Sequence, residues 1–306
     1  MNWNNKILAI IFFALFGIWI LTNVINKPAT RSFRSTLLAI DTSSVDRIIL
    51  YPDGIDSSFV ELRKEGNGWR LQKDQRQANA DPDKVKNLLG SMVLIPTKQL
   101  VSKKPENQAN YEVDEATGKI VEVYSGDDLI ERIIFGRFNF NQATRSSTSY
   151  ARLSDENEIY ALDGMAGLSF DKDFNAFRNT ELCRINPVDI KGITYNDQQL
   201  ALNDQAQWVT NGVSLDSTQM ANYLNGLRVV TNFSFADDFV EMATPDHRLQ
   251  IIADNQTRPL EIKAYARGGG FVVKSSENEA FFTSDSTGVY QKVFGQLKDM
   301  MAPPTN

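Results

Sequence analysis

Two stretches of the chain repeat one pattern of apolar and polar positions. From an opening aspartate, "DPDKVKNLLGSM" at 81–92 and "DSTQMANYLNGL" at 216–227 both carry apolar residues at offsets 4, 7, 8 and 11. That spacing puts the apolar side chains on one face of an α-helix, and aspartate is a favoured N-cap residue. We therefore predict amphipathic helices at 81–93 and 216–228, with inward faces formed by Val85, Leu88, Leu89, Met92, Met220, Tyr223, Leu224 and Leu227.

Segments of alternating apolar and polar residues flank each predicted helix and indicate strands. The first set is VDRIILY, SFVELRKE and GWRLQK before the helix, then KIVEVYS, ERIIFGR, SYARL and EIYAL after it. The second set repeats this order with IKGITY, QQLAL and QWVTNG, then RLQIIAD, PLEIKAY, GGFVVKSS and AFFTS.

The repeated order predicts an α+β chain of two tandem modules, at 45–163 and 185–297, joined by a linker at 164–184. Each module is expected to lay one helix on an antiparallel sheet. Trp69 and Trp208 are expected to occupy corresponding positions in the two cores. Chance similarity between two helices is the alternative to duplication.

An uncharged apolar run precedes the modules. "ILAIIFFALFGIWILTNVI", at 7–25, would span about 29 Å as a helix, close to the hydrocarbon thickness of a bilayer. We expect an uncleaved transmembrane anchor, because a signal peptide has a shorter apolar core and a small-residue cleavage site, which "NVINKPATR" does not offer. Signal cleavage is the alternative. The remaining segments are expected to be a short tail at 1–6, a linker at 26–44 and a C-terminal tail at 298–306.

The charges near the anchor leave its orientation open. Lys6 precedes the apolar run, whereas Lys27, Arg31 and Arg34 follow it. By the positive-inside rule, the larger number of positive charges after the run would keep the large domain in the cytoplasm. Long domains, however, cross the membrane largely regardless of charge.

The overall charge argues against nucleic acid as a partner. The 306 residues carry a net charge of −6, and a protein that binds the phosphate backbone needs a positive field. The single cysteine excludes an intramolecular disulfide and leaves the redox compartment undecided.

One histidine and one cysteine limit the available chemistry. His247 cannot build a zinc site of several His or Cys ligands, and no nucleophile can be placed beside it as a general base, so a surface role is expected. Cys183 could act as a nucleophile, but a free cysteine is more often a small buried apolar residue.

"DKDFNAF", from Asp171, imitates the start of a calcium loop with Asp173 and Asn175 at the third and fifth positions. The sixth position is Ala176 instead of glycine and the twelfth is Leu182 instead of glutamate, so the loop fails as a calcium site and a solvated acidic linker is expected.

The glycine-rich "RGGGF" at 267–271 is followed by strand-forming residues and not by a helix, which favours a hairpin turn over a phosphate cradle. Tyr111 and Asp114 are interpreted as a turn with a packed aromatic ring; a binding pair is the alternative. We assign no catalytic, cofactor-binding or metal-binding residue.

The anchor and several motifs together resemble domain-of-unknown-function family 4340. The motifs are "VDRI", "GWRL" before the Asp-capped helix, "YEVDEATGKIVEV", "SYARLSDENEIYAL" and "AFRNTEL". Family members commonly show Tyr-Gly-Leu-Asp where this chain has Tyr111, Glu112, Val113 and Asp114, so the glycine of that turn is replaced.

Members of that family carry an N-terminal membrane anchor and are typically encoded beside ABC-transporter components like those of gliding-motility and exporter systems. The resemblance implies an inner-membrane, single-pass protein with its large domain in the periplasm of a Gram-negative cell. Its implied partners are transporter permease or auxiliary subunits.

These observations favour a noncatalytic, membrane-anchored accessory or scaffold subunit of an export or gliding-related complex. One alternative is an envelope hydrolase that uses paired carboxylates, for which no spacing selects a pair. A second alternative is a solute-binding module that uses the cleft between the modules.

Overall fold

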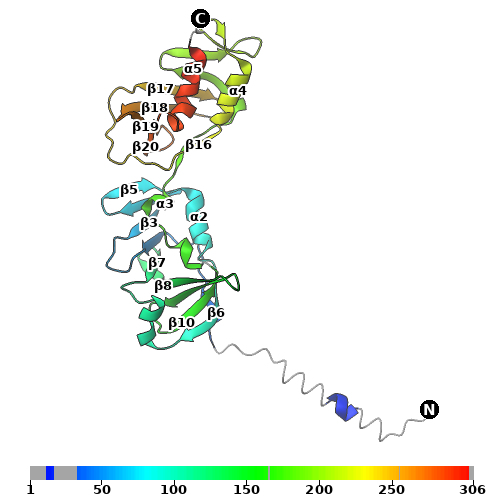
Figure 1. The fold of residues 1–306 in the computed structure, drawn as a ribbon, viewed down its shortest axis with the longest axis vertical. Coiled ribbons are helices and arrows are strands. Elements are labelled where there is room, and N and C mark those ends of the chain that lie inside the picture. The colour runs from blue at the N-terminus through cyan, green and yellow to red at the C-terminus, as the bar shows by residue number, and fades with distance from the viewer. Residues whose placement is uncertain (1–11, 17–32, 165, 255, 303–306) are drawn as a thin grey trace, which may run out of the picture. The chain divides into compact units, whose positions relative to one another are not determined.

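The computed structural model describes residues 12–16, 33–164, 166–254 and 256–302 (Figure 1). Antiparallel sheets with a few helices make up this part of the chain, which confirms the α+β class. The chain divides into two compact units, one of residues 1–45, 50–57 and 88–171, the other of residues 46–49, 58–87 and 172–306. Residues 58–87 therefore group with the later part of the chain, unlike the division predicted at 163 and 185.

Among the described residues, one sheet has ten strands in the order β1-β6-β10-β9-β8-β7-β2-β3-β4-β5. Their bounds are β1 Thr36–Leu38, β2 Arg47–Tyr51, β3 Val60–Glu65, β4 Gly68–Lys73, β5 Arg76–Asn79, β6 Ile95–Ser102, β7 Lys119–Ser125, β8 Asp128–Asn141, β9 Ser146–Leu153 and β10 Ile159–Asp163.

A second sheet has eight strands in the order β15-β14-β13-β12-β17-β18-β19-β20, and β11 pairs separately with β16. Their bounds are β11 Glu181–Arg184, β12 Ile190–Tyr195, β13 Gln198–Leu202, β14 Trp208–Thr210, β15 Val213–Ser214, β16 Val229–Thr231, β17 His247–Ala253, β18 Leu260–Arg267, β19 Gly270–Ser275 and β20 Phe281–Ser284.

The two larger sheets share one order of strands. The run β5-β4-β3-β2-β7-β8-β9-β10 in the first sheet has the same succession as β15-β14-β13-β12-β17-β18-β19-β20 in the second. In each case one helix follows the fourth strand of the meander, α2 (Pro82–Gly90) or α4 (Ser217–Gly226). The strand after that helix pairs with one that precedes the meander, β6 with β1 and β16 with β11.

Both predicted helices form, and their predicted apolar faces turn inward. The carboxylate of Asp216 accepts a hydrogen bond from the backbone N–H of Gln219 at 2.7 Å, and that of Asp81 accepts one from Asp83 at 3.0 Å. Seven of the eight predicted inward side chains are buried, and Leu89 is half-buried. Capping and burial of one face therefore account for both helices.

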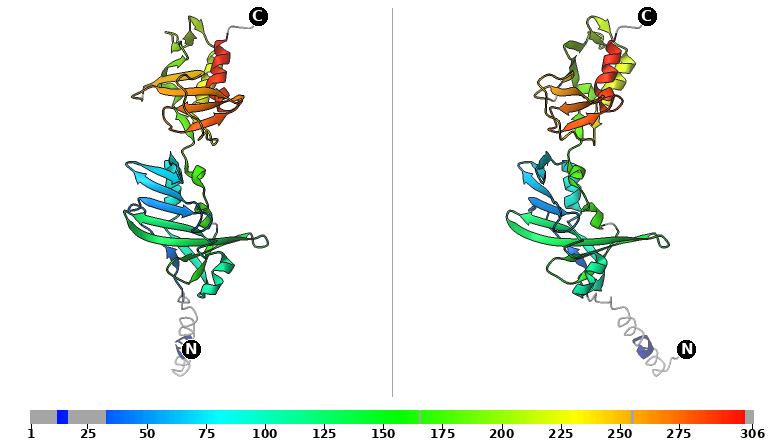
Figure 2. Two further views of the ribbon diagram at one scale, coloured as in Figure 1. Left: turned by 90° about the vertical axis from the view of Figure 1, so that its left-hand side faces the viewer. Right: turned by 60° about the vertical axis from the view of Figure 1, so that its left-hand side comes forward.

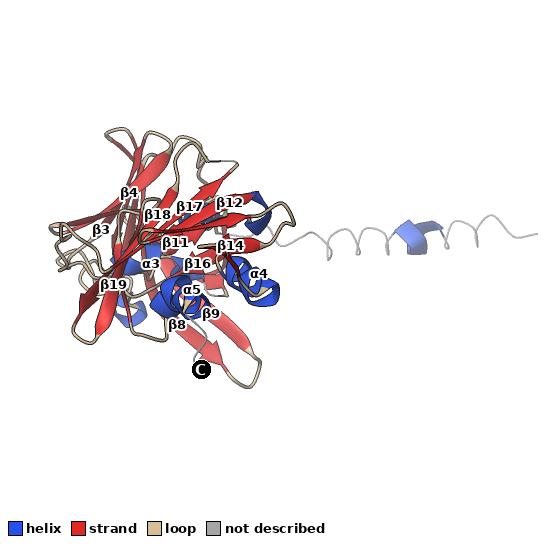
Figure 3. Cartoon of the chain, turned by 90° about the horizontal axis from the view of Figure 1, so that it is seen from above, coloured by secondary structure: helices blue, strands red, loops and turns tan. Residues whose placement is uncertain are grey.

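A C-terminal helix was not predicted. One π-helical turn at Gln291–Gly295 leads into α5 (Gln296–Met301), which lies beside α4 (Figures 1 and 3). The Tyr223 hydroxyl donates a hydrogen bond to the backbone oxygen of Val293 at 2.9 Å, and Phe294 and Leu297 are fully buried. The helix thus runs past residue 297, where the predicted module ends.

Short helical segments complete the described fold. They are α3 Phe174–Phe177 and the 3₁₀ turns Pro105–Asn107, Ala109–Tyr111, Ala166–Ser169 and Pro187–Asp189.

Trp69 and Trp208 lie near the start of β4 and β14, which hold the same place in the two sheets, but neither is buried as expected. Trp69 is half-buried on β4; it shares the face of the buried Leu71 but lies next to the β3–β4 turn, at the margin of the core. Trp208 is also half-buried and packs against the core of the second sheet.

The predicted anchor at 7–25 lies mostly outside the described residues. Residues 12–16 are helical and exposed. Within the part of the chain that is described, no helix is both long and apolar enough to cross a membrane.

Truncation of Leu227, which is fully buried at the end of α4, should lower the free energy of unfolding by about 2 to 5 kcal/mol because Leu227→Ala leaves a cavity. Urea denaturation measures the change. Asn222→Ala, at an exposed position on the same helix, is the control and should change stability by less than about 0.5 kcal/mol. Equal effects of the two variants would contradict the inward placement of this helix face.

Candidate functional site

His247, at the start of β17, lies in a cluster of aromatic rings. Its Nδ1 is 2.8 Å from the hydroxyl of Tyr195 and its Nε2 is 3.0 Å from the hydroxyl of Tyr290. The rings of Phe271 and Phe294 lie 5.7 and 5.8 Å from the imidazole, centroid to centroid. Both ring nitrogens are occupied by phenols, so the histidine links the C-terminal helix to the sheet and is not poised to activate a nucleophile.

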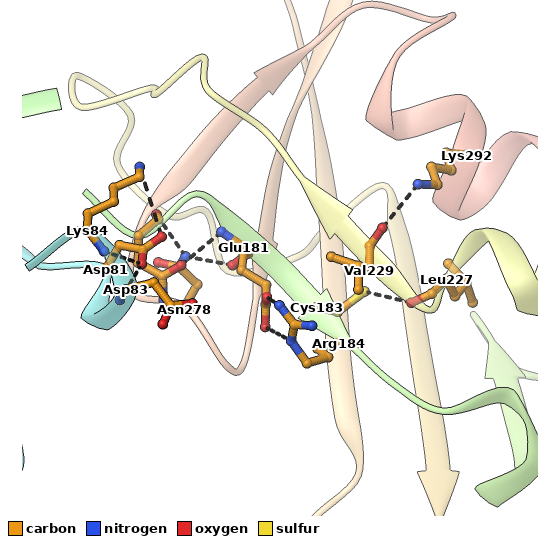
Figure 4. A network of polar contacts seen from close by, with 11 residues as sticks. Asp81, Asp83, Lys84, Glu181, Cys183, Arg184, Leu227, Val229, Asn278 and Lys292 are labelled. Carbon is orange, nitrogen blue, oxygen red and sulfur yellow. Dashed lines mark hydrogen bonds and ion pairs between the residues drawn. The ribbon is translucent and has the colours of Figure 1, made fainter. Parts of the chain in front are cut away.

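Cys183 is fully buried on β11, and its Sγ lies 3.8 Å from the backbone oxygen of Leu227 (Figure 4). Burial raises the pKa of its thiol to about 12. The thiolate that a nucleophile requires is therefore scarce at neutral pH. The structure places this residue in the core, as the sequence favoured.

The residues of the imitated calcium loop do not converge. Asp171 pairs with Lys119 at 3.6 Å, whereas Asp173 pairs with Lys73 at 2.7 Å and caps α3. Asn175 accepts a hydrogen bond from Arg178 at 3.2 Å. Among the described residues, no group of three His, Cys, Asp or Glu side chains could hold a metal ion.

The glycine-rich segment is a hairpin turn, as expected. Gly268 and Gly269 join β18 to β19 with φ of 57° and 83°, which favour glycine. The turn borders an open hollow of about 670 Å³, where Arg267 is held by Asp238 at 2.7 Å. The positive charge of Arg267 in this hollow is therefore already neutralised by a carboxylate of the same chain.

Tyr111 and Asp114 belong to a turn, also as expected. The Asp114 carboxylate accepts hydrogen bonds from the backbone N–H groups of Ala116 and Thr117, both at 3.0 Å. Glu112 adopts φ 56°, so the position where the family commonly has glycine keeps the left-handed conformation with a glutamate.

The feature with the clearest potential for binding is a hairpin that the sequence did not single out. We call residues 136–149, the outer part of β8 and β9 with their connecting turn, the arm. β8 has 14 residues, and the arm projects beyond the neighbouring strands (Figure 2). β18, at the corresponding place in the second sheet, has 8 residues and ends in the tight glycine turn.

The base of the arm is held firmly. β8 has an irregular register between Phe135 and Phe138, and a Cβ at Gly136 would lie only 2.1 Å from the backbone oxygen of Tyr111. The Arg137 guanidinium lies over the rings of Tyr111 and Tyr150, at 5.2 and 5.5 Å from their centroids. Close packing and cation–π contacts therefore fix the direction in which the arm leaves the sheet.

The arm exposes two phenylalanines. Phe138 and Phe140 are 39% and 57% exposed and share one face, opposite Ser149 and Ser147 on β9. A serine offers little apolar surface to cover an aromatic ring across the strand pair. Neither ring therefore faces an apolar side chain of matching size on β9.

The arm is also basic. Residues 133–154 contain Arg137, Arg145 and Arg152 but no Asp or Glu, in a chain whose net charge is −6. Arg152 is buried and donates to backbone carbonyls, including that of Val113 at 2.7 Å. Arg137 and the exposed Arg145 therefore supply the positive charge of the arm.

The sequence does contain a signal for the arm. The predicted strand ERIIFGR ends at Arg137, but the alternation continues as Phe138, Asn139, Phe140, Asn141. This pattern extends the strand; only the structure shows that its apolar face remains exposed.

Comparison with known proteins identifies one family. The family model described as Domain of unknown function (DUF4340) matches residues 69–249 of the chain. Neither a curated protein nor a solved structure matches the chain significantly.

The pKa of His247 is lowered, first because burial among the rings disfavours the imidazolium and second because of Lys298, whereas Asp246 opposes the shift. The unfolded chain therefore takes up the proton at higher pH than the folded chain. The stability contributed by this residue should be complete above the unfolded pKa of about 6.5 and should decline as the pH falls through the folded pKa.

Urea unfolding of the wild type and of His247→Gln at pH 7.5 and 5.5 tests whether His247 makes the protein less stable at low pH. The wild type should lose more stability on acidification than the variant. Identical losses would show that the titration of His247 is not linked to folding.

Proposed function

The chain belongs to the DUF4340 family, and on that basis we propose that it is a noncatalytic, membrane-anchored subunit of an envelope complex that works by binding. The observation that carries this proposal is the arm. It presents two exposed phenylalanines and two arginines on a hairpin with a rigid base.

The arm is not required by the fold. The corresponding hairpin, β18–β19, reaches the same place in its sheet with 8 residues in β18 and a two-glycine turn. Exposed aromatic rings cost stability or solubility unless a partner covers them, and aromatic residues and arginine are enriched at protein interfaces. These arguments favour a docking role for the arm.

We further propose that the chain arose from two tandem modules. The shared strand order, the equivalent positions of α2 and α4 and the pairing of β6 with β1 and β16 with β11 support this interpretation. Under it, the arm is an elaboration of one copy, which fits a function acquired by that copy.

The proposed anchor is the apolar run at 7–25. Only seven residues, 26 to 32, separate it from the described domain, so the domain would lie within roughly 30 Å of the membrane. Confinement at the membrane raises the effective concentration near an integral partner, so that high affinity in solution is not needed.

The family resemblance directs the proposal to an accessory or scaffold role in an ABC-type export or gliding-related complex. The partners would be permease or auxiliary subunits, with the large domain in the periplasm. The locations of His247, Cys183 and Asp171 fit the noncatalytic role, because each is engaged in packing or in an ion pair.

Replacement of both exposed rings, as Phe138→Ser with Phe140→Ser, should release the protein from its complex without unfolding it. Co-purification of partners from detergent-solubilised membranes measures the change, and circular dichroism checks the fold. The matched control is Leu202→Ser with Val213→Ser, two exposed apolar positions on the second sheet, which should retain the partners. Retention by the arm variant would contradict the docking role.

Removal of residues 1–26 should abolish function, whereas His247→Gln, Cys183→Ala and Asp171→Asn should each preserve it. Complementation of a deletion strain measures the outcome. Loss of function in a stably folded point variant, with the anchor dispensable, would instead favour an enzyme.

A further inference from the structure

We propose that the arm receives an extended, acidic segment of a partner protein, which adds as a strand to the outer edge of β8. This inference rests on the proposed binding function and specifies the chemistry of the partner.

The outer part of β8 has an open backbone edge. The register of β7 on β8 ends with Lys119 opposite Phe135, whereas β9 continues along the other side of β8 as far as Asn141. Among the residues that the structure describes, β8 therefore has a neighbouring strand on only one side from Phe138 to Asn141. An added strand would supply hydrogen-bond partners to the N–H and C=O groups along this edge.

The side-chain pattern of the arm also suits an added strand. Phe138 and Phe140 lie two residues apart on one face, which is the spacing of alternate residues along a strand. Apolar residues at alternate positions of the added strand would cover both rings. Aromatic and β-branched cross-strand pairs of this kind stabilise sheets.

The charge of the arm favours an acidic partner. Arg145 is exposed at the turn and the half-buried Arg137 lies at the base, so each end of the arm carries a positive group. The segment 133–154 contains no Asp or Glu that could neutralise these arginines. A segment with carboxylates at its polar positions complements this field, whereas a basic segment is repelled.

Two other occupants fit less well. Lipid tails cannot satisfy the backbone groups of an unpaired strand edge, so deep insertion in a bilayer is disfavoured. Pairing of β8 with β8 of a second copy would bring two sets of arginines together. An acidic strand meets the requirements of the backbone, the rings and the charge.

Binding of short probe peptides to the full-length chain in detergent micelles tests the inference. One probe alternates Val and Glu, a second alternates Val and Lys, and a third is the Val/Glu sequence N-methylated at alternate amides, which removes backbone donors but keeps every side chain. Fluorescence anisotropy measures affinity, and hydrogen exchange locates the site.

The Val/Glu peptide should bind and slow amide exchange in residues 137–141. The N-methylated and Val/Lys peptides should bind at least about tenfold more weakly, a difference of about 1.4 kcal/mol. Arg145→Glu should shift preference toward the Val/Lys peptide, and Phe138→Ser with Phe140→Ser should weaken binding of the Val/Glu peptide. Leu202→Ser should leave it unchanged.

Equal binding of the N-methylated peptide, or protection of amides elsewhere than the arm, would overturn strand addition. Sedimentation with anionic vesicles that depends on Phe140, or a dimer that is lost in the arm variant, would also overturn it in favour of lipid or a second copy. Failure of the proposed function is judged separately, by co-purification. If the Phe138→Ser with Phe140→Ser variant loses its partners but the wild type does not bind the Val/Glu peptide, the docking role stands and the acidic strand is refuted.

Discussion

An open antiparallel sheet has outer strands with unpaired backbone groups, and in this chain other segments cover parts of these edges. At β20, the N–H of Thr283 donates to the oxygen of Ser234 and the oxygen of Phe281 accepts from Ala236, both at 2.8 Å. At β5, the N–H of Asn179 donates to the oxygen of Asn79 at 3.2 Å. β15, at the other end of the second sheet, is limited to two residues.

The outer part of β8 departs from this arrangement. Its edge extends past the end of β7, and the rings of Phe138 and Phe140 extend past the core. A rigid base, set by Gly136 and by Arg137 over two tyrosines, holds this edge in a defined direction. The binding hypothesis follows from that combination, because a mobile edge would cost more entropy to order on binding.

Much of the architecture could be predicted from the sequence because its periodicity is strong. The apolar face from Met220 to Leu227 is buried as its spacing required. The C-terminal helix was not predicted, although Val293, Phe294 and Leu297 have helical spacing; its first turn is π-helical and ends at Gly295. Trp69 was misplaced because alternation fixes the face of a strand but not its distance from the edge of the core.

The candidate site was harder to predict. Its defining property is that Phe138 and Phe140 are not buried, and the sequence pattern of an exposed apolar face is the same as that of a buried one. The single His247 and Cys183 attracted chemical hypotheses because of their reactivity. Their phenolic and backbone partners give them structural roles that no spacing in the sequence reveals.

Contact between the arm and a subunit of a membrane complex can be detected in intact cells. Site-specific photo-crosslinking from p-benzoylphenylalanine at position 140, with position 213 as the control, measures it. We expect a crosslink from position 140 to an acidic, extended segment of a membrane-complex subunit, identified by mass spectrometry, and none to that segment from position 213. Crosslinks from position 140 only to lipid, or to the same proteins as from position 213, would contradict it.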